Sequence, residues 1–180
     1  SKFLQYARIE RSAFNKVELC HLISETIEIL FHHESMNPNI MLDLVSDESI
    51  VYVIGDEDLI KQILINLAAN ACESFDGRAG ELTFEVINDS ANGIVRLSVK
   101  DNGPGIPDEI LKKIYQPFFS TKKSGTGLGL SIVHRIAETL GIDLKVYSKL
   151  GVGTTFEICF KTYIQPGVSD LRSSTSQNVY

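Results

Sequence analysis

The chain has 180 residues, of which 43% are hydrophobic and 22% charged, proportions typical of a soluble globular domain with a substantial core. A net charge of −6 argues against a nucleic-acid-binding surface, and no apolar run is long enough to span a bilayer. Three cysteines lie far apart in apolar segments without a CxxC pair, which predicts reduced thiols in a cytoplasmic domain that makes no direct membrane contact.

The spacing of apolar residues predicts the elements, three or four apart for helices and two apart for strands. In the first half these are a helix over 18–35, strands over 39–45 and 50–54, and a long helix over 56–74. In the second half they are strands over 82–88 and 93–101, a short helix between loops over 102–127, a helix over 128–141, and strands over 142–148 and 154–161. Strands mostly joined by hairpins, with helices between them, predict an α+β fold: a two-layer sandwich with one mixed sheet and helices on one face.

Two asparagines interrupt the apolar side of the long helix. Asn66 and Asn70 lie four residues apart at the edge of the apolar stripe, and therefore on one face of the helix. A single asparagine there is most simply a surface residue, whereas two in register indicate a polar wall facing a cavity. Amide oxygens are neutral, hard ligands that suit Mg²⁺.

A carboxylate follows the apolar face of the strand over 93–101. Asp101 continues the inward alternation of residues 95–99, and a buried carboxylate needs a hydrogen-bond donor to offset its lost hydration. Gly103 and Gly105 leave space beside it. The same "DNGPG" stretch is also favourable turn chemistry, so by itself it fits a structural turn and a ligand site equally well.

Glycines alternate just before the helix over 128–141. Gly125, Gly127 and Gly129 allow backbone N–H groups to approach an anion at the positive end of the helix dipole. Their spacing matches neither the dinucleotide fingerprint nor the P-loop. Taken alone, this stretch is equally compatible with a flexible loop that binds nothing.

These features occur together in the order of a known set of motifs. The motifs are "NLAANA" (66–71), "DNGPGI" (101–106), "PFFSTK" (117–122), "GTGLGLS" (125–131) and "GVGTTF" (151–156). Over residues 19–161 the chain resembles the ATP-binding catalytic domain of sensor histidine kinases. That domain has the Bergerat fold and belongs to the superfamily shared with DNA gyrase, Hsp90 and MutL. The short lid between Tyr115 and Thr126 is similar to that of the nitrogen-regulator-like kinases.

The resemblance implies a site for ATP and Mg²⁺. Asp101 would accept a hydrogen bond from the adenine amine with support from Thr154, Asn70 would hold the metal, and Asn66 and Lys122 would take catalytic roles. The expected nucleotide-binding residues are Asn66, Asn70, Asp101, Gly103, Gly105, Ile106, Lys122, Gly125, Thr126, Gly127, Leu128, Gly129, Leu130 and Thr154.

One position of the resemblance indicates the type of reaction. ATP-hydrolysing relatives carry a glutamate one helical turn before the metal-binding asparagine, and this chain has Asn66 there, which is a poor base. We therefore expect a protein-histidine kinase whose phosphoacceptor lies on a dimerisation domain outside this chain, with the receiver domain of a response regulator as a further partner. An anti-sigma-type serine kinase and a non-catalytic docking module are the alternatives. Glu73 and Ser74 stand where the family more often has lysine and tyrosine.

The stretch "HHESMNP" (32–38) resembles a phosphoacceptor box around His33. It lies only 33 residues before Asn66, and residues 7–19, which precede it, resemble the segment that closes the dimerisation domain. We therefore expect the likeness at His33 to be coincidental.

Because the chain begins with serine, it is expected to be part of a longer protein. We expect residues 1–18 to be the end of the dimerisation helix and its linker, 19–161 to form the catalytic domain, and 162–180 to form a mobile tail.

Overall fold

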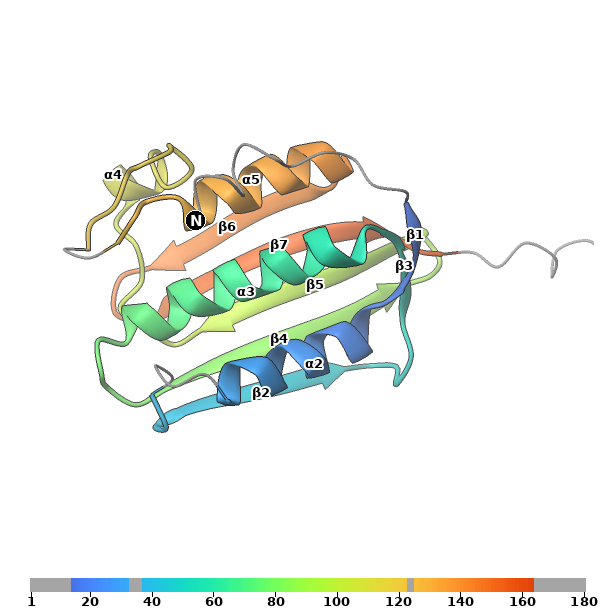
Figure 1. Ribbon diagram of the computed structural model, residues 1–180, viewed down its shortest axis with the longest axis horizontal. Helices are drawn as coiled ribbons and strands as arrows, with labels where there is room; N and C mark the ends of the chain where they lie inside the picture. The colour runs from blue at the N-terminus through green and yellow to red at the C-terminus, as the bar shows by residue number, and fades with distance from the viewer. Residues whose placement is uncertain (1–13, 33–36, 123–124, 164–180) are drawn as a thin grey trace, which may run out of the picture.

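The computed structural model in Figure 1 describes residues 14–32, 37–122 and 125–163. The helices are α2 (Leu19–Phe31), α3 (Glu57–Ser74), α4 (Asp108–Leu111) and α5 (Gly129–Leu140). The strands are β1 (Asn15–Glu18), β2 (Ile40–Ser46), β3 (Tyr52–Gly55), β4 (Gly80–Asp89), β5 (Ile94–Asp101), β6 (Asp143–Lys149) and β7 (Gly153–Lys161). In these residues no helix is both long enough and apolar enough to cross a membrane.

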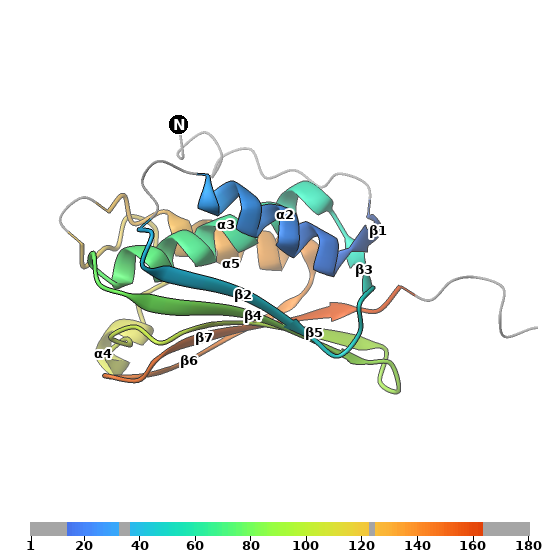
Figure 2. The same ribbon diagram turned by 90° about the horizontal axis from the view of Figure 1, so that it is seen from below.

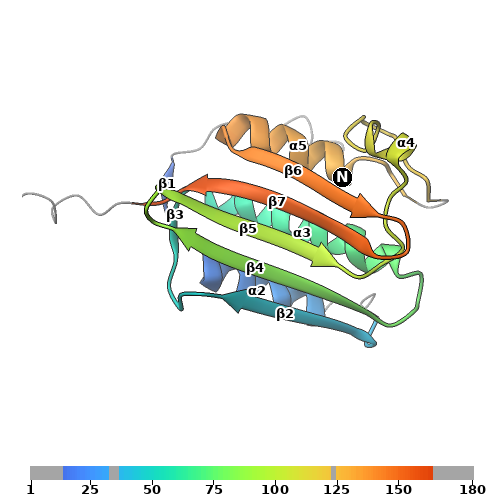
Figure 3. The ribbon, with the colours of Figure 1, turned by 180° about the vertical axis from the view of Figure 1, so that it is seen from behind.

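The main sheet has five strands in the order β2-β4-β5-β7-β6. β2 pairs with β4 in parallel, and the other neighbours are antiparallel. The helices α2, α3 and α5 cover one face of this sheet, as Figure 2 shows from the side, while Figure 3 shows the opposite face without a helical layer. The predicted α+β sandwich with a mixed sheet and helices on one face is confirmed.

The core lies between α3 and the inward faces of the central strands. The fully buried side chains of α3 include Ile60, Ile63, Leu64 and Leu67. They face the strand residues that alternate inward, which are Leu82, Phe84, Val86, Val95, Leu97, Val99, Phe156, Ile158 and Phe160. Each such side chain contributes about 1.5–3 kcal/mol through its removal from water. Because this apolar stripe fixes the rotation of α3, its polar edge is turned toward α5 and the strand ends.

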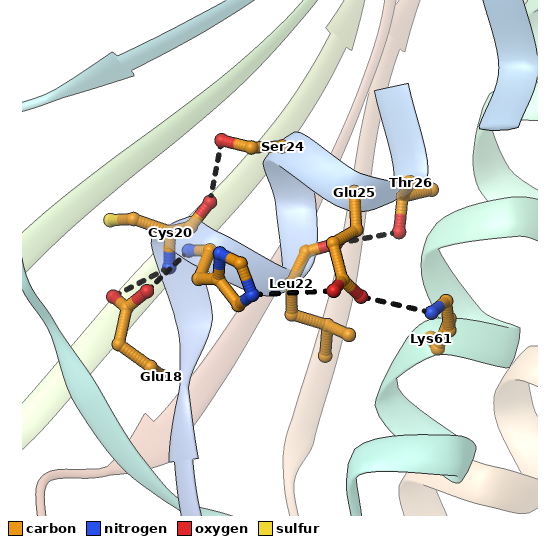
Figure 4. Close-up of polar contacts among 8 residues, drawn as sticks. Glu18, Cys20, Leu22, Ser24, Glu25, Thr26 and Lys61 are labelled. Atoms are coloured by element: carbon orange, nitrogen blue, oxygen red, sulfur yellow. Dashed lines mark hydrogen bonds and ion pairs between the residues drawn. The ribbon is translucent and has the colours of Figure 1, made fainter. Parts of the chain in front are cut away.

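Polar contacts at the start of α2 join it to its neighbours (Figure 4). The Glu18 carboxylate caps the helix by accepting from the N–H groups of Cys20 and His21, and it also accepts from Val51 N at 3.2 Å. Further along α2, Glu25 forms an ion pair with Lys61 of α3 at 3.1 Å. The Glu18 carboxylate thereby satisfies N–H groups in the first turn of α2.

The structure differs from the predicted elements at β1 and β3. Residues 15–18, expected to be a linker, form a strand that pairs antiparallel with β3 in a separate two-stranded sheet. The alternation was not visible in the sequence because only Val17 of "NKVE" is apolar and buried. β3, expected over 50–54, begins at Tyr52 and belongs to this small sheet.

The ends of the predicted domain are only partly described. Thr162 forms a bridge with Val53, and Tyr163 N donates to Tyr52 O at 3.0 Å, so pairing continues two residues past Lys161. His32 follows α2 as its C-cap, with Nδ1 2.8 Å from Glu28 O. His33 and the remainder of the predicted linker and tail lie outside the described residues.

Candidate nucleotide-binding site

The polar edge of α3 contacts two loops that are far apart in the sequence. Its residues Asn66, Asn70 and Ser74 follow one another at steps of about 6 Å along the helix. At Gly129, where α5 begins, a Cβ atom would lie 3.4 Å from both Asn66 Oδ1 and Asn70 Nδ2. At Gly103, after β5, a Cβ atom would lie 2.8 Å from Ser74 Oγ. We call the neighbourhood of Asn66, Asn70 and Gly129 the helix end of the site, and that of Gly103 the strand end.

The strand end is organised around Asp101, the last residue of β5. Its Oδ1 accepts from Gly103 N at 2.9 Å and from Thr154 N at 3.2 Å. Burial raises the pKa of the Asp101 carboxyl group above its ordinary value, and these two hydrogen bonds act in the opposite direction. Both bonds use Oδ1, so neither of them occupies Oδ2. The inward orientation predicted for Asp101 is therefore observed, and the turn and the inward carboxylate occur together.

Glycines press the loop after β5 against the hairpin that joins β6 and β7. A Cβ at Gly105, whose φ is +72°, would lie 2.2 Å from Lys149 O, and one at Gly153 would lie 1.9 Å from Asp101 O. Gly151 N also donates to Pro104 O at 2.8 Å. Backbone contacts this close exclude any side chain at Gly105 and Gly153, and they hold the loop in one position beside Asp101.

Sequence reasoning missed Ser148 at the strand end. Its Oγ lies 2.9 Å from Thr154 Oγ1 and accepts from Ile106 N at 2.7 Å. The alternation of β6 could have identified it, because Leu144, Val146 and Ser148 share the inward face of this strand. Ser148 is thus a polar inward residue near the end of β6, as Asp101 is at the end of β5.

Two hollows are lined in part by the loop after β5. One of about 210 Å³ is lined by Phe75, Arg78, Ala79, Asn102, Gly103, Pro104 and Gly151. The other, of about 470 Å³, is lined by Ile106, Pro107, Asp108, Glu109, Ser148, Lys149 and Leu150. Both lie at the strand end, and the polar contacts rather than these hollows define the site between α3 and α5.

The helix end combines two amide side chains with a glycine. Asn66 Nδ2 donates to Gln62 O at 2.8 Å, which leaves Asn66 Oδ1 free to accept. Asn70 Nδ2 is buried and has no hydrogen-bond partner among the described residues. Because an unpaired buried amide costs about 1–3 kcal/mol, Asn70 is a group that gains from a ligand. The two asparagines lie together with Gly129, as the sequence predicted.

The first turn of α5 is left without a side-chain cap. Its N-cap residue, Leu128, makes no capping hydrogen bond, and the first turn contains no acidic residue. In contrast, α3 is capped by Asp56, which accepts from Leu59 N at 3.1 Å, and α2 is capped by Glu18 (Figure 4). The amide groups at the start of α5 can therefore serve an anion.

The segment before α5 places a lysine at the helix end. Lys122 Nζ lies 2.8 Å from Glu73 Oε2 and 3.4 Å from Asn70 O, so its positive charge is beside the metal-binding candidate. The segment folds back on itself where Phe118 N donates to Gly127 O at 2.9 Å. Sequence reasoning identified Lys122 but did not identify Glu73 as its partner.

The remaining predicted residues differ in what they can offer. Leu128 is buried in the core, and Leu130 packs against the core, so neither presents a side chain freely to a ligand. Gly125 packs over Ser120, with a Cβ position 2.4 Å from Ser120 Oγ. Thr126 is exposed on the loop.

The helix end fits a magnesium ion that arrives with phosphates. In the described part of the chain no three His, Cys, Asp or Glu side chains gather as a metal site. Mg²⁺ commonly keeps several waters and binds substrate phosphates together with only one or two protein oxygens. An amide of Asn70, whose oxygen and nitrogen can exchange places by rotation, satisfies that requirement.

Known proteins are similar to this chain in sequence. Residues 55–164 match the family model described as histidine kinase-, DNA gyrase B-, and HSP90-like ATPase. The signal transduction histidine-protein kinase AtoS of Escherichia coli strain K12 is 34% identical over 161 residues, which is 87% of this chain and 25% of AtoS.

Solved structures agree with this relationship. The catalytic domain of histidine kinase ThkA is 34% identical with a TM-score of 0.73, covering 84% of this chain and 97% of that one. ThkA in complex with the response regulator protein TrrA is 32% identical with a TM-score of 0.73, covering 90% of this chain and 46% of that one. The chain spans about a quarter to a third of the length of the curated relatives that it matches. By these matches, the chain belongs to the family of histidine kinase-, DNA gyrase B- and HSP90-like ATPases.

Proposed function

We propose that this chain is the catalytic domain of a two-component sensor histidine kinase, which binds Mg²⁺-ATP and transfers the γ-phosphate to a histidine on a separate dimerisation domain. The observation that carries the proposal is the amide of Asn66, one helical turn before Asn70 and facing Gly129. ATP-hydrolysing relatives have a carboxylate at this position. An amide can orient a group by hydrogen bonding, but it cannot remove a proton from water.

Adenine is expected at the strand end. The available Oδ2 of Asp101 can accept a hydrogen bond from the exocyclic amine of the base, and guanine carries a carbonyl oxygen at that place. The loop from Gly103 to Ile106 supports this role because it is fixed against the β6–β7 hairpin. Recognition through an acceptor of fixed position discriminates strongly against a base that lacks the matching donor.

The phosphates are expected at the helix end. The uncapped amides at the start of α5 can donate to phosphate oxygens, and the third N–H of the Lys122 ammonium group can reach the γ-phosphate while the other two contact Glu73 and Asn70 O. Mg²⁺ held by Asn70 would neutralise phosphate charge, which matters in a chain of net charge −6. Positioning and charge stabilisation of this kind account for most of the catalysis in phosphoryl transfer.

The expected partners are the dimerisation domain of the same kinase and the receiver domain of a response regulator. The similarity to ThkA, whose structure was solved with the response regulator TrrA, supports the second partner. The proposed order is transfer from ATP to the histidine and then from the histidine to the receiver domain. Domain boundaries at residues 18 and 161 remain part of this proposal.

The test uses ATP labelled at the γ-phosphate, this chain and a separately supplied dimerisation domain. We expect the label on that domain in a bond that acid breaks and base preserves, which identifies phosphohistidine. The variant Asp101→Ala serves as the control without nucleotide binding. Rapid release of free phosphate by the chain alone would contradict the assignment of Asn66.

The other outcomes separate the remaining candidates. An acid-stable label on serine would favour the anti-sigma-type kinase, and tight ATP binding without transfer to any acceptor would favour a docking module. Label on the chain itself that disappears in His33→Ala would show that His33 is an acceptor after all.

A further inference from the structure

A row of polar residues crosses three neighbouring strands at the strand end of the site. Asp101 of β5 is in register with Thr154 of β7, and Thr154 is in register with Ser148 of β6. The next inward row consists of the apolar residues Val99, Phe156 and Val146. Because side chains in register on one face of a sheet are direct neighbours, the polar row forms a continuous border between the core and the site.

The contacts of Ser148 determine how its single hydrogen is used. Ser148 Oγ lies 3.1 Å from Gly153 O, and a carbonyl oxygen can only accept, so the Ser148 hydrogen goes to Gly153. Ile106 N donates to Ser148 Oγ at 2.7 Å. The contact of 2.9 Å between Ser148 Oγ and Thr154 Oγ1 must then use the hydrogen of Thr154. Ser148 thereby makes the one donated and two accepted bonds that a hydroxyl group can make.

This arrangement fixes the polarity of the Thr154 hydroxyl. With its hydrogen directed to Ser148, Thr154 Oγ1 offers only lone pairs in its remaining directions. Asp101, whose Oδ1 is bound by Thr154 N, is also an acceptor when ionised. The two groups then present acceptors alone to a ligand, which complements an amine and opposes a carbonyl oxygen.

We propose that Ser148 is a specificity-determining positioning residue that selects purines with an exocyclic amine at the adenine position over purines with a carbonyl there. It acts through Thr154 by fixing its hydroxyl as an acceptor, and through Ile106 by holding the loop after β5. This inference rests on the proposed binding of ATP at this site. Without the Ser148 hydroxyl, the Thr154 hydrogen is free to turn toward the ligand and to donate to a carbonyl oxygen.

The test compares the affinities of three Mg²⁺-nucleotides for the chain by calorimetry. ATP carries the amine, inosine triphosphate carries a carbonyl, and purine riboside triphosphate carries only hydrogen. For Ser148→Ala we expect about a tenfold loss of ATP affinity, with little change for inosine triphosphate, so the ratio between them falls about tenfold. Ser148→Thr, which keeps the hydroxyl, should restore most of the ratio.

Ser98→Ala is the matched control, because Ser98 is a buried serine of β5 that alternates to the opposite face of the sheet from Asp101. It should leave all three affinities unchanged. An equal loss for all three nucleotides in Ser148→Ala would show a merely structural role and overturn this inference alone. If Ser148→Ala does not fold, Ser148→Cys, which donates and accepts only weakly, provides the same ratio. Failure of the unaltered chain to bind any of the nucleotides would instead overturn the proposed function and this inference with it.

Discussion

The two ends of the site are built in different ways. At the strand end, Asp101 and its loop are held by backbone groups of three adjacent strands, with glycines packed directly on carbonyl groups. At the helix end the ligand-facing groups are two side-chain amides, an uncapped helix start and one ion pair, whose partners Lys122 and Glu73 are 36% and 53% exposed. The comparison indicates that the strand end, where we propose the base binds, is held in place by the protein itself. The helix end, where we propose the phosphates bind, leaves charged and polar groups for a ligand to complete.

The largest expected effect tests how rigid the strand end is. In Gly153→Ala the new Cβ would lie 1.9 Å from Asp101 O at a φ of +137°, so the hairpin and the loop must move apart. We expect the free energy of unfolding to fall by about 3 kcal/mol or more, with loss of ATP binding, measured by denaturant titration and calorimetry. Gly151→Ala in the same turn is the control. Its φ is +72° with no atom within 4 Å of the added Cβ, so it should cost only about 1–2 kcal/mol. Equal effects in the two variants would contradict a tightly packed strand end.

The second prediction separates binding from stability at Asp101. Asp101→Asn keeps an oxygen for Gly103 N and Thr154 N but turns an amide NH₂ group toward the adenine amine. We expect ATP affinity to fall by about 2 kcal/mol, or roughly thirtyfold, while the free energy of unfolding at neutral pH stays unchanged or rises. Asp143→Asn, which removes an exposed carboxylate of β6, should change neither quantity.

The pH dependence of stability should change in the same variant. Because burial raises the pKa of Asp101 in the folded chain, the folded state binds its proton more readily than the unfolded state. Ionisation of Asp101 therefore destabilises the fold as pH rises from its unfolded pKa through its higher folded pKa. Asp101→Asn should lack this loss in acid-range unfolding curves. A wild-type contribution that increases with pH over that window would contradict the assignment.

Much of the strand end could be predicted because strand alternation is a local pattern. Asp101 was found from the apolar residues on its own strand, whereas the mixed sheet was predicted from strands mostly joined by hairpins with helices between them. Ser148 obeys the rule too, because it shares one face of β6 with Leu144 and Val146, but only these two apolar residues mark that face. Its role also depends on the register with β7, which local spacing does not contain.

At the helix end the two asparagines could be predicted from the sequence, but the ion-pair partner of Lys122 could not. The helical period placed Asn66 and Asn70 together, and both lie beside Gly129. The contact of Lys122 with Glu73 joins residues that are 49 apart, so no periodic pattern predicts it. The pairing of β1 with β3 was missed for the same physical reason, since it is a tertiary contact of a strand with a single buried apolar residue.

The third prediction concerns the close approach of α5 to α3. Gly129→Ala places a methyl group 3.4 Å from the nearest amide atoms of both asparagines, in the space expected for the metal and phosphates. We expect the affinity for Mg²⁺-ATP to fall by about 1 kcal/mol, while the unfolding free energy rises slightly because alanine is the better helix former. Gly141→Ala at the other end of α5 should instead lower the unfolding free energy without affecting binding. Its φ is +65° in open space, so it costs stability of about 1 kcal/mol and leaves binding unchanged.

The smallest expected effect lies in the exposed pair of Lys122 and Glu73. A double-mutant cycle with Lys122→Gln, Glu73→Gln and both together should give a coupling of about 0.5 kcal/mol in unfolding experiments without nucleotide. The coupling should disappear in 1 M salt, because the pair is only partly shielded from solvent. In binding experiments Lys122→Gln should weaken ATP more than ADP, since we propose that the third N–H of Lys122 donates to the γ-phosphate. A coupling that withstands 1 M salt would mean that Lys122 is held as firmly as the groups around Asp101, and the contrast between the two ends would then be lost.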